Sequence, residues 1–297
     1  YYTEEELGPS YEHAGARITE LVERTPGIIA FVPQQFIVRQ DSVHLLRDNT
    51  ISVKDVFAGA EWFSTATPAA QFGFLPLITG TLWVSLFAIL IALPFGLSVA
   101  IYMSEVANPK VRNLLKPIIE LLSGIPSVVY GFFGLIVIVP LIQKVFDLPV
   151  GESGLAGSIV LAIMALPTII TVTEDAMRNC PRAMREASLA LGASQWQTIY
   201  KVVIPYSVSG ITSGVVLGIG RAIGETMAVL MVTGNAAVIP HTILEPLRTI
   251  PATIAAELGE APAGGAHYEA LFLLGVVLFF ISLLINFTVE AVSARKR

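Results

Sequence analysis

An arginine and a glutamate, Arg221 and Glu225, are embedded in a stretch of the chain that otherwise carries no charge. Residues 202–220 are uncharged, and so are residues 226–244. Ionisable residues in so apolar a setting are energetically expensive, which makes them candidates for a functional site. Residues four apart in a continuous helix lie on the same face. We therefore expect the two side chains to neutralise each other in the empty state and Arg221 to receive an anion.

The chemistry of the two side chains suits an anion pathway. A guanidinium stays protonated and forms bidentate hydrogen bonds with phosphate oxygens. Glu225 would hold Arg221 when no anion is present and would oppose retention of an anion, and Thr226 is a candidate hydroxyl donor beside the path. The alternative is a buried ion pair that only fixes helix packing, although such pairs are weak evidence for stability.

Other polar residues offer fewer possibilities. Ser127 and Tyr130, in the run IPSVVYG, are candidates to line the same pathway, or their hydroxyls bond only to helix backbone. Cys180 is the single cysteine, so no internal disulfide can form, and we expect a reduced thiol without a role. The four histidines show no metal-ligand spacing and are expected at the surface, so no metal site is predicted: His13, His44, His241 and His267.

The composition indicates that these residues lie in a membrane protein. The chain is 54% hydrophobic and 14% charged, and its mean hydropathy is +0.71, far above that of a soluble domain. A helix needs about 20 apolar residues to cross the bilayer. The charge-free runs predict an all-α polytopic bundle with five spanning helices, at residues 75–104, 117–146, 154–178, 204–234 and 269–291.

The distribution of basic residues predicts the orientation, because cytoplasmic connections are rich in Lys and Arg. The connections at 147–153 and 235–268 contain a single basic residue, Arg248. The C-terminus is therefore expected in the cytoplasm and residues 1–74 outside it, followed by the membrane domain at 75–297. A net charge of −5 argues against a nucleic-acid partner and leaves lipid as the surrounding medium. The basic residues on the predicted cytoplasmic side are Lys110, Arg112, Lys116, Arg178, Arg182, Arg185, Lys201, Arg295, Lys296 and Arg297.

Small residues and helix breakers are frequent in the predicted spans. Glycines every four residues let helices approach closely in a membrane, which places the fourth span in the middle of the bundle. Proline removes a backbone hydrogen bond, so the prolines mark either cavity-lining, movable helices or ordinary structural kinks. The glycines are Gly210, Gly214, Gly218, Gly220 and Gly224, and the prolines are Pro94, Pro126, Pro140, Pro167 and Pro205.

A predicted cytoplasmic segment, residues 179–204, joins the third and fourth spans. Its sequence predicts a short amphipathic helix after Pro181 that ends near Gly192, and then a second helical run into the next span at Pro205. The apolar side contains Leu189 and Leu191. Such a helix can lie on the membrane surface or insert into a groove of a soluble partner, and the residues alone leave both possibilities open.

This segment resembles the EAA loop of permease subunits of ATP-binding-cassette importers. The loop pattern is Glu-Ala-Ala, three residues, Gly, nine residues and Ile-x-Leu-Pro. Mild departures are Ser188 for the second Ala, Val202 for Ile and Ile204 for Leu. The resemblance implies a coupling helix that docks into a separate ATPase subunit. The residues that it assigns to coupling are Arg185, Glu186, Ala187, Gly192 and Pro205.

Three further runs are similar to the phosphate-specific branch of these permeases, at residues 72–82, 120–140 and 218–235. Gly-Glu-Thr-Met-Ala-Val at 224–229 resembles the PstC-type subunit, and the branch ties an Arg and a Glu at the positions of Arg221 and Glu225 to transport. The resemblance covers about residues 55–297. It implies the type I importer (MetI-like) fold, whose six-helix members have one more N-terminal span, and phosphate import.

The resemblance also implies partners: a homologous PstA-type permease subunit, a homodimeric PstB-type ATPase and an extracytoplasmic phosphate-binding protein. The chain contains no Gly-x-x-x-x-Gly-Lys-Ser/Thr loop, so Mg-ATP is expected on the partner, and this chain is not an enzyme and holds no cofactor. The alternatives are a permease for sulfate, molybdate or phosphonate, a phosphate-sensing regulatory subunit, and a secondary transporter, which the EAA-like pattern disfavours.

Overall fold

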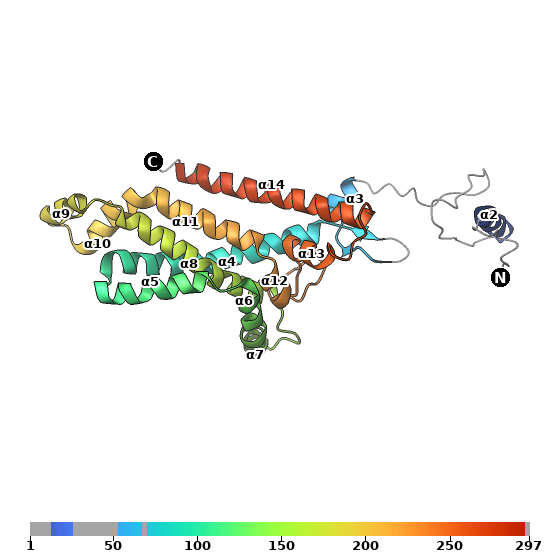
Figure 1. The fold of residues 1–297 in the computed structure, drawn as a ribbon, viewed down its shortest axis with the longest axis horizontal. Coiled ribbons are helices and arrows are strands. Elements are labelled where there is room, and N and C mark those ends of the chain that lie inside the picture. Colours follow the sequence, from blue (N-terminus) through green and yellow to red (C-terminus); the bar gives the residue numbers. More distant parts are fainter. Residues whose placement is uncertain (1–12, 26–52, 67–69, 295–297) are drawn as a thin grey trace. The chain divides into compact units, whose positions relative to one another are not determined.

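The structure, a computed structural model, describes residues 13–25, 53–66 and 70–294 (Figure 1). The chain divides into two compact units, Tyr1–Val53 with Thr65–Ala70 and Lys54–Ser64 with Gln71–Arg297. In the first unit, the described helix is α2 (Ala14–Arg24), where Glu20 pairs with Arg17 and Arg24. The helix α4 begins at Leu75, and the short strands before it belong to the same unit as the helices.

The remaining elements are helices apart from one pair of short strands. Three of the helical segments have the wider π-helical turn. In chain order the elements are α3 (Val53–Ala58), β1 (Trp62–Phe63), β2 (Gln71–Phe72), α4 (Leu75–Ile101), η2 (Tyr102–Val106), α5 (Pro109–Ser123), α6 (Ser127–Phe133), η3 (Gly134–Ile138), α7 (Val139–Phe146), α8 (Gly154–Arg178), α9 (Arg182–Ala190), α10 (Gln195–Thr198), η4 (Ile199–Val203), α11 (Ile204–Gly224), α12 (Met227–Val232), α13 (Ile250–Glu257) and α14 (Ala266–Ala294).

Five helical segments of the described chain are long and apolar enough to cross a membrane. They confirm the predicted all-α class and the predicted number of spans. The first, third and fifth predicted spans agree with the structure to within a few residues. The five segments are Leu75–Val106, Ser127–Phe146, Gly154–Arg178, Gln195–Gly224 and Ala266–Val289.

The predicted beginning of the second span at residue 117 is wrong. Residues 117–123 belong to α5, a separate helix that ends at Ser123, and the span begins at Ser127 after Gly124 and Pro126. A proline has no N–H and disfavours a helical conformation of the residue before it, so the two helices cannot merge across Pro126. The uncharged run, residues 121–143, therefore contained the end of one helix and most of the next span.

The predicted end of the fourth span at residue 234 is also wrong. The helix α11 ends at Gly224, Glu225 is extended with ψ 134°, and α12 begins at Met227. One oxygen of the Glu225 carboxylate accepts a hydrogen bond from the backbone N–H of Ala228 at 3.3 Å, which stabilises the beginning of the new helix. Arg221 and Glu225 therefore do not share one continuous helix.

The most buried of the five spans is α8, which packs against α4 and α11. On α11, Gly210, Gly214 and Gly218 face α8 so closely that an added Cβ would contact Ala176, Thr173 or Ile169. This confirms close packing for three of the five glycines. A Cβ at Gly220 or Gly224 would meet no atom within 4 Å, so those two glycines are not part of this contact.

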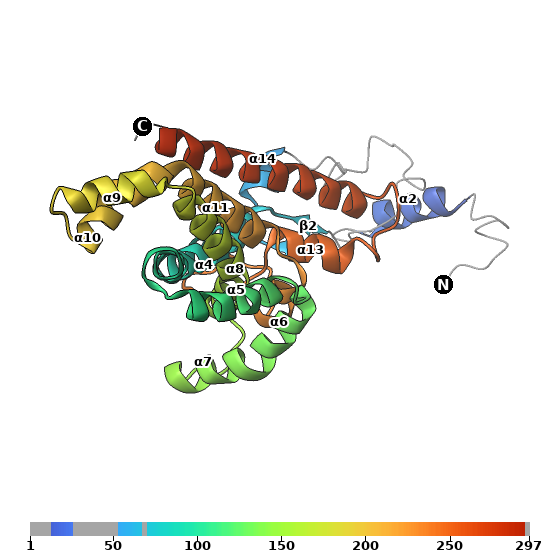
Figure 2. The same ribbon diagram turned by 60° about the vertical axis from the view of Figure 1, so that its left-hand side comes forward.

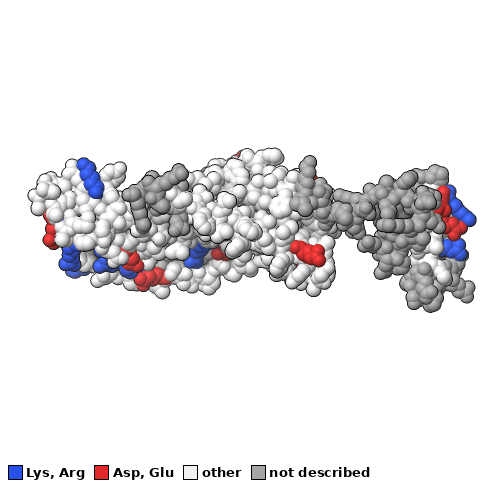
Figure 3. Space-filling view, turned by 90° about the horizontal axis from the view of Figure 1, so that it is seen from above, with Lys and Arg blue, Asp and Glu red and all other residues white. Residues whose placement is uncertain are grey.

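Two groups of elements lie at opposite ends of this helical unit (Figures 1 and 2). One end contains α9 and α10. The other contains α13 and the antiparallel strands β1 and β2, in which Trp62 lies opposite Phe72. Trp62, Phe72 and Phe74 pack there against Ile250 and Leu271. On the face of this helical unit shown in Figure 3, Lys and Arg gather mainly toward the α9 end.

Candidate functional site

Several predicted pathway residues lie around the break between α11 and α12. Arg221, on the last turn of α11, is half-buried. The two helices on either side of this site are in contact, because a Cβ at Gly131 of α6 would lie 2.8 Å from the sulfur of Met231 of α12. The structure thus brings α6, which carries Tyr130, against α12, which begins directly after the break.

The other predicted pathway residues have less defined roles. Tyr130 is buried and donates its hydroxyl hydrogen to the carbonyl of Leu122 at 2.7 Å, so its hydroxyl is bonded to backbone, as one of the two interpretations required. Ser127, one turn earlier on α6, and Thr226, at the break, are both half-buried. Glu225 is half-buried too, and within the described residues it forms no ion pair with Arg221.

Irregular backbone at this place has a physical implication. In a hydrocarbon environment, unpaired backbone groups are tolerated only where protein surrounds them or where they line a water-filled cavity. Glu225 and Thr226 interrupt a helix of otherwise apolar residues, and the carboxylate bonds to backbone. The expected ion pair between Arg221 and Glu225 is therefore not formed among the described residues.

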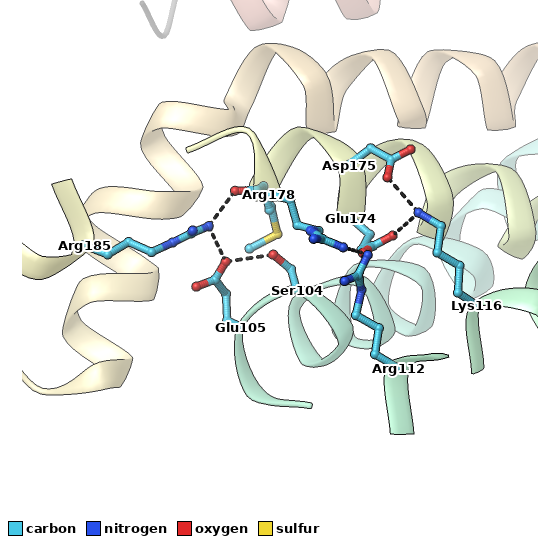
Figure 4. Close-up of polar contacts among 9 residues, drawn as sticks. Ser104, Glu105, Arg112, Lys116, Glu174, Asp175, Arg178 and Arg185 are labelled. Atoms are coloured by element: carbon cyan, nitrogen blue, oxygen red, sulfur yellow. Dashed lines mark hydrogen bonds and ion pairs between the residues drawn. The ribbon is translucent and has the colours of Figure 1, made fainter. Parts of the chain in front are cut away.

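A buried carboxylate that the sequence analysis missed lies at the α9 end of the unit (Figure 4). Glu174, at the end of α8, is only 1% exposed and is surrounded by three cations. It accepts hydrogen bonds from Arg112 at 2.9 Å and Lys116 at 3.0 Å, and it pairs with Arg178 at 3.5 Å. Hydrogen bonding to Asp175 raises the pKa of Lys116 against the effect of burial. These contacts fasten α5 to α8.

The predicted amphipathic helix is α9, which begins directly after Pro181. Gly192 follows it with φ +86°, a conformation that favours glycine, and a capping box between Ser194 and Gln197 begins α10. The predicted helix–turn–helix order is therefore confirmed. The apolar side chains at this end are exposed, and they include Met184, Leu189, Leu191, Trp196 and Tyr200.

The residues assigned to coupling do not all behave alike. Glu186, Ala187, Gly192 and Pro205 are exposed, whereas Arg185 turns inward and donates hydrogen bonds to Glu105 and to the carbonyl of Met177, each at 2.8 Å. Cys180 is buried nearby, and burial raises the pKa of its thiol, which agrees with an unreactive cysteine.

A second missed cluster lies at the opposite end of the unit, around Glu257 of α13. Its carboxylate accepts hydrogen bonds from the Trp62 indole at 3.0 Å, the Ser64 hydroxyl at 2.9 Å and Arg248 at 2.6 Å. His267 contacts it at 2.8 Å. Burial alone would raise the pKa of Glu257, but the contact with His267, the charge of Arg248 and the other hydrogen bonds together lower it.

The Glu257 cluster corrects one sequence prediction. His267 is not a surface residue, because its side chain is 14% exposed and lies against Glu257. His13 and His241 are exposed as expected, and His44 lies outside the described residues. Within the described chain, no group of three or more His, Cys, Asp or Glu side chains could hold a metal ion.

Only one of the missed residues left a signal in the sequence. Glu174 directly follows an uncharged run and precedes Arg178 by four residues, the spacing of a helical ion pair. Arg185 lies 80 residues from Glu105, and Trp62 lies 195 residues from Glu257, so no local pattern predicts these two contacts.

The fold and the site define a multi-pass membrane protein of the permease class. Residues 92–297 match the family described as binding-protein-dependent transport system inner membrane component. The chain belongs to this family, whose members are permease subunits of ATP-binding-cassette transporters.

Several known proteins are similar to this chain over most of its length. A probable ABC transporter permease protein, YqgH of Bacillus subtilis, is 40% identical over 84% of this chain and 80% of its own length. The phosphate transport system permease protein PstC of Mesorhizobium japonicum is 39% identical, covering 72% of this chain and 71% of its own. PstC of Pasteurella multocida is 36% identical over 74% and 75% of the two chains.

Solved structures confirm the fold. A chain of the MetNI methionine ABC transporter in an inward-facing conformation matches with a TM-score of 0.56 at 19% identity, covering 76% of this chain and 94% of its own. A bacterial ABC transporter for import of the acidic polysaccharide alginate matches with a TM-score of 0.56 at 19% identity, over 75% and 79% of the two chains. At such low identity the similarity concerns the fold alone, and the predicted type I importer fold is confirmed.

Proposed function

We propose that this chain is the PstC-type permease subunit of an importer that moves inorganic phosphate into the cell. The observation that carries the proposal is Arg221, a permanently charged side chain held half-buried in a spanning helix, in a chain whose relatives include PstC phosphate permeases. A guanidinium forms paired hydrogen bonds with phosphate oxygens, which a simple point charge does not.

The pathway residues have distinct roles in this proposal. Arg221 contacts the passing anion, and Ser127 and Tyr130 lie beside the path on α6, which packs against α12. Thr226 offers a hydroxyl at the helix break. Glu225 adds a negative charge next to the path, which disfavours retention of the anion. A transporter needs both an attractive and a releasing element, because the substrate must leave as well as enter.

The proposal assigns energy supply to another polypeptide. The exposed apolar side chains of α9 and its neighbours, led by Leu189 and Leu191, would insert into a PstB-type ATPase homodimer that binds Mg-ATP. A PstA-type subunit would complete the pathway, and an extracytoplasmic binding protein would deliver phosphate. The α9 end and the C-terminus then lie on the cytoplasmic side of the cell (inner) membrane. The basic residues at the α9 end support this orientation.

The test is ATP-dependent uptake of labelled phosphate into vesicles that contain the complete importer. We expect uptake to require ATP and the binding protein, and to be inhibited by unlabelled phosphate but not by sulfate, molybdate or phosphonate. Uptake of one of those anions in place of phosphate would overturn the substrate assignment. Phosphate-dependent signalling by a complex that moves no anion would instead indicate a regulatory subunit.

A further inference from the structure

The carboxylate of Glu105 connects the first spanning helix with the segment that contains α9 and α10. Glu105 lies in η2, directly after α4, and its side chain is only 9% exposed. It accepts hydrogen bonds from Arg185 of α9 at 2.8 Å and from the hydroxyl of Ser104 at 2.7 Å (Figure 4). A charge-assisted pair in so enclosed a place is stronger than an exposed one.

The same residue also reaches the second half of the loop through its backbone. The side chain of Gln195, the first residue of α10, donates a hydrogen bond to the carbonyl of Glu105 at 3.0 Å. Arg185 in turn donates to the carbonyl of Met177 in α8 at 2.8 Å. Glu105 therefore contacts both helices of the loop, and Arg185 joins the end of α4 to the end of α8.

The local backbone places Glu105 in this position. Residues Tyr102–Val106 form a π-helical turn, a rare geometry that is frequent at functional sites. A second π-helical segment, Ile199–Val203, leads from α10 into α11. The loop is therefore bordered by irregular helix at its contact with α4 and at its entry into α11.

The helices α4, α8 and α11 pack against one another. α8 and α11 are joined to the loop by the chain itself, and Ser207 of α11 donates a hydrogen bond to the carbonyl of Ala176 in α8 at 3.1 Å. In the sequence, α4 is not adjacent to the loop, but it packs along α8, where Ser158 donates a hydrogen bond to the carbonyl of Val84 at 3.2 Å. The side chain of Glu105 adds a direct link from α9 to the end of α4 through Arg185.

We propose that Glu105 is a positioning residue whose carboxylate, through its pair with Arg185, makes α4 follow the movement of the coupling loop (residues 179–204). The inference rests on the proposed function, because it takes α9 to be the helix that an ATPase moves. The proposal assigns Glu105 no contact with substrate or ATP. Its role is to convert movement of one short helix into a joint movement of three spans.

The first test measures phosphate uptake and ATP hydrolysis in the same vesicles, for the wild type, Glu105→Ala and the matched control Glu120→Gln. Glu120 is an exposed carboxylate on α5. We expect Glu105→Ala to lower the number of phosphate ions imported per ATP by about five-fold or more, and Glu120→Gln to leave that ratio unchanged. Restoration of the ratio by the charge exchange Glu105→Arg with Arg185→Glu would support the pair directly. An unchanged ratio in Glu105→Ala, including a parallel fall of uptake and hydrolysis, overturns the proposal.

The second test needs no substrate and separates the inference from the proposed function. Spin labels at Ala183→Cys and Val106→Cys, two exposed positions, report the distance between α9 and η2 in the assembled complex after the buried Cys180 is replaced by Ser. We expect a narrow distance distribution that Glu105→Ala broadens. If the wild-type complex imports no phosphate, the proposed function fails, and this distance still decides whether Glu105 holds the loop. An unchanged distribution overturns the proposal.

Discussion

Glu225 accepts a hydrogen bond from the backbone N–H of Ala228 at 3.3 Å, so its carboxylate holds the beginning of α12 rather than the guanidinium of Arg221. Two functions are therefore separated along the chain. Arg221, at the end of α11, presents the positive charge, and Glu225, in the break, supports the backbone that follows. The two residues can be tested independently.

Replacement of Arg221 should impair transport while the complex stays assembled. We expect Arg221→Ala to lower phosphate uptake by about ten-fold or more, which corresponds to about 1.4 kcal/mol of lost interaction. Arg221→Lys should retain part of the activity, because an ammonium keeps the charge but not the paired hydrogen bonds. Uptake in vesicles and the size of the purified complex are the measurements. Full uptake in Arg221→Ala would mean that the residue serves only packing.

The charge and the hydrogen bond of Glu225 can be distinguished by two substitutions. Glu225→Gln keeps an oxygen that can accept from Ala228, whereas Glu225→Ala removes it. We expect the alanine variant to lose about 1 kcal/mol of unfolding free energy, as for other lost helix caps, and the glutamine variant to unfold like the wild type. Both should transport phosphate more slowly because the negative charge is gone. Normal uptake in Glu225→Gln would restrict the role of Glu225 to the cap.

The Glu257 cluster should make the stability of the protein depend on pH, with a loss of stability in acid. The pKa of Glu257 in the folded protein is below the usual 4.5. The contribution of this carboxylate to the free energy of unfolding is therefore fully present above pH 4.5, and it is lost as the pH falls through the lowered pKa. Glu257→Gln should be less stable than the wild type by about 1.5–3 kcal/mol at neutral pH, and the difference should narrow below about pH 4. Thermal unfolding in detergent across this range is the measurement.

A matched control for the Glu257 experiment lies three residues further on. Glu260 is exposed, so Glu260→Gln should change the unfolding free energy little at any pH. A stability difference for Glu257→Gln that stays constant from neutral pH to acid would show that shape, and not charge, accounts for the effect of the substitution.

Two glycines on α11 predict opposite results for the same substitution. A methyl group at Gly218 would lie 2.7 Å from Cγ1 of Ile169, whereas one at Gly220 would meet nothing within 4 Å. We expect Gly218→Ala to destabilise the protein by about 1–3 kcal/mol through overpacking, and Gly220→Ala to be neutral or to stabilise it by up to about 1 kcal/mol through helix propensity. Thermal unfolding of both variants in detergent tests this. Equal melting temperatures would contradict the close contact of α11 with α8.

The sequence by itself determined the properties that depend on local composition and spacing. Apolar runs long enough to cross a bilayer predicted all five spans, because length and hydropathy alone decide membrane insertion. The positions of Pro181 and Gly192 predicted where α9 begins and ends, because each residue restricts its own backbone. The resemblance of the loop and of residues 218–235 identified the family.

Only the tertiary structure decided where the helices break and which distant charges meet. The break at Glu225 is not visible in the hydropathy of the surrounding sequence, because it depends on a hydrogen bond that competes with helix continuation. Arg185 reaches Glu105 across 80 residues, and Trp62 reaches Glu257 across 195. Hydropathy and helical spacing describe neighbours within a few turns, whereas these pairs form because packing of the spans brings separate helix ends together.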